Sequence, residues 1–129
     1  APEAGASLPH RRQRGGHTFS KHRYLAAQLV GYLEDGTWLE TAAQANAKAA
    51  RLAAALAAHP DVEILHPVEA NMIFARWPRE LHDRLQGAGA VYYTYPDGPD
   101  DPRPMARLVC DWSVDDGETD IFLRLLQAG

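Results

Sequence analysis

The chain has 129 residues, a mass of 14.2 kDa and a formal net charge of −4. Its length suits one domain, and its 46% hydrophobic content excludes a mostly disordered chain. No apolar run approaches the roughly 18 residues of a membrane-spanning helix, and the acidic balance disfavours general nucleic-acid binding. The single cysteine, Cys110, excludes an internal disulfide and is typical of a cytoplasmic protein. We therefore expect neither a membrane nor a nucleic acid as partner.

The first nine residues are rich in Pro, Gly and Ala and have no periodic pattern. This composition predicts a loose lead-in over residues 1–9, followed by one domain over residues 10–129. The chain begins at Ala1 without a signal segment, so it is expected to be an internal piece or a processed product.

Two helices are predicted next. Residues 20–34 place apolar side chains at steps of three and four, and residues 37–58 contain eleven alanines with a narrow apolar stripe. The stripe consists of Trp38, Ala42, Ala45, Ala49, Leu52 and Leu56. Lys48 lies outside this stripe and is expected to face solvent.

The remaining chain changes to short β-branched and aromatic runs. Strands are predicted over residues 62–65, 72–76, 91–95 and 106–112. Helices are predicted over residues 79–86 and over a last segment that carries Ile121 and Leu125. This order of elements indicates an α+β fold with a short mixed or antiparallel sheet packed with helices.

The last predicted strand carries a candidate binding residue. Side chains alternate along a strand, so Leu108, Cys110 and Trp112 should face the core while Arg107 points the other way. A guanidinium held on a strand can grip a carboxylate with two parallel hydrogen bonds. The alternative is an exposed arginine that pairs with a surface acid.

A second candidate is the basic stretch from His10 to Arg23, which contains five of the 13 Lys and Arg residues. Cations and a Gly-Gly pair before a helix suit an anion, although a solvated basic loop explains the same composition. The histidines lack the spacing of a metal site, and no serine stands in a nucleophile motif. The residues by themselves therefore yield neither a metal site nor a complete catalytic set.

Several segments, in order, resemble the C-terminal domain of the low-specificity L-threonine aldolases, which are β-eliminating lyases among the fold-type-I pyridoxal-phosphate enzymes. The segments are His10–Gly16, Ser20–Gln28, Tyr32–Gly36, Trp38–Leu39, His66–Asn71 and Arg107–Val109. The resemblance extends over most of the chain from about His10 to Leu126.

The resemblance implies a small domain that closes over pyridoxal phosphate held by a large N-terminal domain, in an oligomer that cleaves threonine-like amino acids to glycine and an aldehyde. Arg107 matches the arginine that grips the substrate carboxylate. The Schiff-base lysine belongs to the large domain, and neither Lys21 nor Lys48 matches it. The chain alone is therefore expected to be inactive, to hold no catalytic residue and not to bind the cofactor covalently, although the intact enzyme would use it.

Three positions depart from the family pattern. Gln13 stands where a lysine is common, so Arg14 or Lys21 is expected to take the phosphate contact. Cys110 and Asp111 stand where small hydroxyl residues are usual, and a carboxylate at position 111 would weaken substrate binding if it faced the site. The alternative functions are an eroded stand-alone binding module with the same fold and a small anion-binding protein.

Overall fold

The computed structural model describes residues 2–98 and 100–128. They divide into two compact units, residues 1–37 and residues 38–129, each of which is described by itself.

The first unit is helical. It contains α1 (Pro2–Arg14), α2 (His22–Leu33) and the 3₁₀ turn η1 (Glu34–Gly36). The helix predicted over residues 20–34 is confirmed by α2, but the predicted lead-in is helical from Pro2 rather than loose. Pro2 lies in the first turn, where its missing N–H would have no partner, and the alanines and Leu8 of this stretch favour a helix. The helix also continues through Pro9, which lies inside it.

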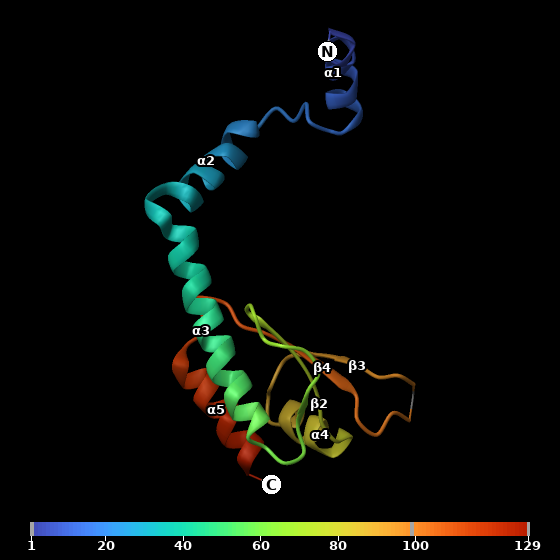
Figure 1. Ribbon diagram of the computed structural model, residues 1–129, viewed down its shortest axis with the longest axis vertical. Helices are drawn as coiled ribbons and strands as arrows, with labels where there is room; N and C mark the ends of the chain where they lie inside the picture. The colour runs from blue at the N-terminus through green and yellow to red at the C-terminus, as the bar shows by residue number, and fades with distance from the viewer. Residues whose placement is uncertain (1, 99, 129) are drawn as a thin grey trace. The chain divides into compact units, whose positions relative to one another are not determined.

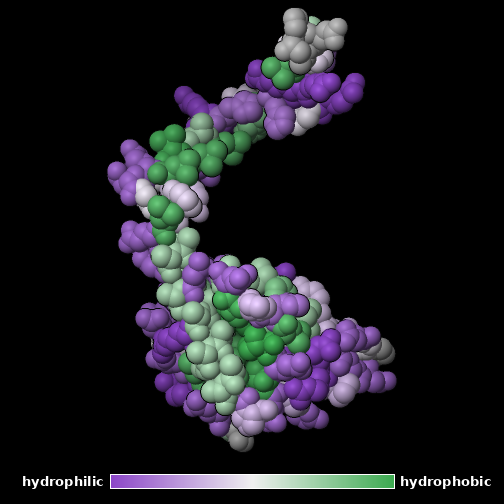
Figure 2. Space-filling model, in the orientation of Figure 1, coloured by the Kyte–Doolittle hydropathy of each residue, from purple (hydrophilic) through white to green (hydrophobic). Residues whose placement is uncertain are grey.

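The apolar side chains of α2 are uncovered. None of its residues is buried, and at least half of each large apolar side chain is accessible to solvent. Figure 2 shows this apolar surface along α2. It is made by Tyr24, Leu25, Leu29, Val30, Tyr32 and Leu33. The periodicity that predicted the helix therefore describes a face with no partner inside the described unit.

The second unit contains nearly all of α3 and a small sheet (Figure 1). Its elements are α3 (Thr37–Ala57), β1 (Glu63–Ile64), β2 (Met72–Arg76), α4 (Arg79–Gly87), β3 (Tyr93–Tyr95), β4 (Met105–Val109) and α5 (Asp116–Gln127). Every predicted strand and helix of this part is present. The predicted α+β fold is confirmed.

The strands form one antiparallel sheet in the order β1-β2-β4-β3. On the central strand β4, Arg107 lies opposite Phe74 of β2 on one side and opposite Tyr93 of β3 on the other. Because successive side chains alternate between faces, Ala106 and Leu108 are buried while Arg107 is on the opposite, open face.

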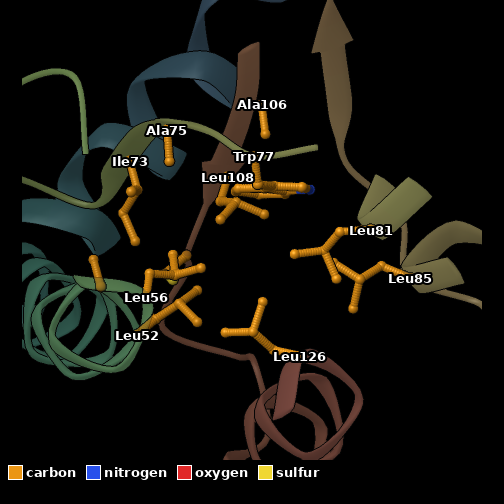
Figure 3. Packing of buried hydrophobic residues seen from close by; sticks show 12 residues of the cluster. Leu52, Leu56, Ile73, Ala75, Trp77, Leu81, Leu85, Ala106, Leu108 and Leu126 are labelled. Atoms are coloured by element: carbon orange, nitrogen blue, oxygen red, sulfur yellow. The ribbon is translucent and has the colours of Figure 1, made fainter. Parts of the chain in front are cut away.

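Three helices cover the buried face of the sheet. Figure 3 shows leucines of α3, α4 and α5 converging on Ile73, Trp77 and Leu108. Helices α3 and α5 lie side by side (Figure 1), and Arg51 of α3 forms ion pairs with Asp116 and Asp120 of α5. The core is therefore a two-layer arrangement of one sheet face and three helices.

The core takes up only part of the α3 stripe, and one core prediction is wrong. The stripe is buried from Ala45 to Leu56, whereas Trp38 and Ala42 are exposed, because the sheet and α5 pack only against the later turns of α3. Trp112 is 59% exposed, because β4 ends at Val109 and the chain turns at Asp111 before the strand alternation reaches it.

A buried histidine joins the segments that precede β3 and β4. His82 of α4 is 3% exposed and stacks on Trp77 with ring centroids 4.6 Å apart. Its Nε2 lies 3.0 Å from the Pro104 carbonyl, which can only accept, so Nε2 carries the proton. The other ring nitrogen, Nδ1, therefore carries no proton and accepts a hydrogen bond from the Tyr92 hydroxyl, which lies 3.0 Å away. Burial lowers the pKa of His82 and raises the pKa of Tyr92 to about 12.

The leucines of α3 allow a test of this core. Leu56 is fully buried, so Leu56→Ala should lower the free energy of unfolding by about 2–5 kcal/mol through lost burial and a cavity. Leu39→Ala, in the exposed part of the same helix, should change it by less than about 0.5 kcal/mol. Urea denaturation measures both variants, and equal losses would contradict the packing described here.

The lowered pKa of His82 sets the sign of a pH effect. The unfolded chain binds a proton at about pH 6.5 and the folded chain only at lower pH, so His82 makes stability fall as the pH drops below about 6.5. We expect His82→Gln to remove most of this pH dependence, whereas His10→Gln, at an exposed position of α1, should keep it. Denaturant midpoints between pH 5 and 8 test this, and an unchanged slope in His82→Gln would refute it.

Candidate functional site

Arg107 is on the open face of the sheet, where the strand pattern placed it. Its guanidinium carbon lies 4.7 Å from the ring centroid of Tyr93 and 5.8 Å from that of Tyr95. Both tyrosines belong to β3, two residues apart, so their side chains share one face of the strand. These distances fall within the range of cation–π interactions.

Arg107 has no anionic partner among the described residues. It forms no ion pair there, and its Nε is buried without a hydrogen-bond partner. By contrast, Arg76 on the neighbouring strand β2 has its Nη2 2.6 Å from a carboxylate oxygen of Asp97. The sequence alternative of a surface arginine paired with an acid is therefore not what the structure shows for Arg107.

An open groove of about 800 Å³ borders Arg107 along the β3 side of β4. Its walls come from the segment before β3, from the end of β4 and from α5. The apolar lining on the β4 side of this groove includes Val109 and Val114. On α5 it includes Ile121 and Phe122. The groove therefore presents the cation Arg107 beside apolar side chains, with Glu118 and Thr119 of α5 also in its lining. A cation next to apolar surface suits a small molecule that carries a carboxylate.

The two departures after Arg107 have structural roles. Cys110 is buried in the core, and burial raises the pKa of its thiol, so it is not a reactive thiolate. The Asp111 carboxylate accepts hydrogen bonds from the Ser113 hydroxyl and from the backbone N–H groups of Ser113 and Val114. These bonds lower the pKa of Asp111. Its charge is thus engaged by its own turn.

Lys48 was expected to face solvent, but it contacts the turn that follows β4 instead. Its Nζ donates a hydrogen bond of 2.9 Å to the Trp112 carbonyl and a second one to the Val114 carbonyl. Its side chain is half-buried. The amine therefore ties α3 to the turn that follows β4, an arrangement that the spacing within the helix did not indicate.

The two predicted phosphate-binding residues belong to the first unit. Arg14 is the exposed last residue of α1, and Lys21 stands exposed at the N-cap of α2 without a capping hydrogen bond from its side chain. The loop between them is organised by the His17 carbonyl, which accepts from Arg12 Nε at 2.9 Å and from His22 Nε2 at 3.1 Å. Arg107 lies in the second unit, and no common site is assigned to the three residues.

Among the described residues, no group of three His, Cys, Asp or Glu side chains is arranged to hold a metal ion. None of the helices in that part of the chain has the length and apolarity to cross a bilayer.

The aromatic setting of Arg107 was missed at the sequence level. The Tyr-Thr-Tyr alternation of residues 93–95 does predict two rings on one strand face. What it cannot predict is the register that pairs Tyr93 with Arg107, because that register depends on the loop of residues 96–104 between the two strands.

Comparison with known proteins gives a consistent assignment. No protein-family model matches the chain. It is 36% identical over 107 residues to a low-specificity L-threonine aldolase of a Pseudomonas species, a match that covers 83% of this chain and 30% of that protein. The low-specificity L-threonine aldolase of Pseudomonas aeruginosa is 36% identical over 106 residues, which cover 82% of this chain and 29% of that protein. The chain thus spans about 30% of the length of these curated relatives.

Solved structures show the same fold. A threonine aldolase of Leishmania major superposes with a TM-score of 0.68 at 24% identity, over 75% of this chain and 28% of that one. A glutamate decarboxylase of Lactobacillus brevis superposes with a TM-score of 0.63 at 18% identity, over 79% of this chain and 25% of that one. In sequence and in fold, the chain therefore matches the C-terminal part of the low-specificity L-threonine aldolases.

Proposed function

We propose that this chain is the part of a pyridoxal-phosphate-dependent aldolase that holds the substrate carboxylate. The whole protein would cleave threonine-like β-hydroxy-α-amino acids to glycine and an aldehyde. The observation that supports this role is Arg107, a strand-held guanidinium with a buried, unpartnered Nε and no carboxylate partner among the described residues. The two relatives that are 36% identical to the chain, over 107 and 106 residues, are both named as low-specificity L-threonine aldolases.

Arg107 would act by orienting the substrate through its carboxylate. A planar guanidinium can donate two parallel hydrogen bonds to a carboxylate, and this fixes the direction of the Cα–carboxylate bond. The substituents at Cα are then held in one orientation relative to whatever group reacts there. A lysine at the same position would supply the charge without the two-bond geometry.

Pyridoxal phosphate, when bound in such an enzyme, supplies an electron sink for the carbanion formed at Cα. The described residues do not by themselves form a site for it. Lys48 Nζ is engaged by two backbone carbonyls, and Lys21 is exposed at the start of α2. Arg14 and Lys21 remain candidates for a phosphate contact, and the large N-terminal domain that contributes the Schiff-base lysine is a proposed partner.

We also propose that the whole protein is a cytoplasmic homo-oligomer. The uncovered apolar face of α2 supports a partner surface in the first unit, because contiguous exposed apolar side chains favour association. A second copy of the chain or the large domain would cover that face.

The carboxylate role of Arg107 can be tested on the 129-residue chain. We expect added L-threonine to shift the Nε–Hε resonance of Arg107, and Arg107→Lys to weaken binding by about 10- to 150-fold, because a lost charge-assisted hydrogen bond costs about 1.5–3 kcal/mol. L-Threoninamide, which lacks the carboxylate, should not bind. Arg76→Lys is the matched control on the same face and should bind like the unmodified chain. Equal affinity in Arg107→Lys would remove Arg107 from the site.

The absence of a Schiff-base lysine from this chain has a separate test. The chain is mixed with pyridoxal phosphate, reduced with borohydride, digested and analysed by mass spectrometry. We expect no stoichiometric pyridoxyl adduct on either lysine, since Lys48 is engaged and Lys21 has no enclosing site. A full-length threonine aldolase treated in the same way serves as the positive control. A stoichiometric adduct on Lys48 or Lys21 would contradict the proposal.

A further inference from the structure

The surroundings of Arg107 contain a feature that carboxylate binding alone does not explain. Tyr93 is 66% exposed and Tyr95 is 40% exposed, although aromatic rings on a sheet usually bury more of their surface. Both rings nevertheless lie within cation–π distance of one guanidinium, at 4.7 and 5.8 Å from its carbon to the ring centroids. Their shared contact is Arg107 of the neighbouring strand.

The sheet register accounts for this contact. Tyr93 pairs directly with Arg107, and Tyr95 pairs with Met105, so Tyr95 is the diagonal neighbour of Arg107 on the same face. Direct and diagonal cross-strand neighbours are within reach of long and aromatic side chains. Two successive positions of β3 thus hold one side chain of β4.

The contact leaves the hydrogen-bonding edge of the guanidinium free. A cation over a ring is attracted through its face, whereas the N–H groups of a guanidinium point outward in its plane. A side chain with several rotatable bonds loses conformational freedom when it binds a ligand, and this loss is smaller when it is already held in place. The rings therefore orient Arg107 while its terminal Nη groups, unlike the buried Nε, stay available.

We propose that Tyr93 and Tyr95 are positioning residues that hold the Arg107 guanidinium in a carboxylate-binding orientation through their ring faces, and not through their hydroxyl groups. This inference rests on the proposed function for its role in binding, but the holding of the side chain can be measured without any ligand. The two rings would then act on substrate affinity through Arg107, without touching the substrate.

The first experiment uses ¹⁵N relaxation of Arg107 Nε in the 129-residue chain without ligand. We expect a rigid Nε in the unmodified chain and in Tyr93→Phe, which keeps the ring, and a mobile Nε in Tyr93→Leu and Tyr95→Leu. Tyr24→Leu is the matched control, because Tyr24 makes a similar contact with Arg23, at 5.1 Å, in the first unit. A mobile Nε in the unmodified chain, or a rigid one in both leucine variants, would overturn the proposal.

The second experiment titrates the same variants with L-threonine. Tyr93→Leu and Tyr95→Leu should each weaken binding by about 2- to 10-fold, the loss expected for a partly exposed cation–π contact, and Tyr93→Phe should restore it. Loss of affinity in Tyr93→Phe would assign the effect to the hydroxyl group and refute the ring-face role. If the unmodified chain holds Arg107 rigidly but does not bind L-threonine, the proposed function fails while the holding of Arg107 by the rings stands.

Discussion

The antiparallel pairing of β2 with β4 is the constraint on which the rest of this structure depends. It places Ile73 and Leu108 on the face covered by helices and Arg107 on the open face. A slip of one residue would exchange these faces, burying a charge and exposing the core leucine. The large cost of burying an unpaired charge and the burial of apolar side chains therefore select the same register. The position of the candidate binding residue follows from how the core is packed.

Both ends of β4 are held by contacts from distant parts of the chain. Before the strand, His82 bonds the Pro104 carbonyl, and after it Lys48 bonds the carbonyls of Trp112 and Val114. The Asp111 carboxylate closes the turn between these last two residues. A side chain can orient a small molecule only as well as its own backbone is held, and these contacts restrain the strand that carries Arg107.

The cations of the second unit differ in how their charge is satisfied. Arg51 and Arg76 pair with carboxylates, and exposed pairs of this kind contribute little to stability. Arg107 instead lies against two aromatic rings and keeps an unpartnered, buried Nε. Arg76 has an equally buried and unpartnered Nε, so what distinguishes Arg107 is its aromatic contacts and the lack of a carboxylate partner among the described residues.

The sequence by itself determined the element types, because the periodicities of helix and strand are local properties: α2, α3, the four strands and the α+β class follow from them. It also determined the resemblance to the threonine aldolases and the face on which Arg107 lies. Only the tertiary structure decided where β4 ends, which half of the α3 stripe is buried, and the partners of Lys48 and Arg107. Lys48 and Val114 are 66 positions apart, and contacts over such separations depend on strand register and helix packing, which no local pattern encodes.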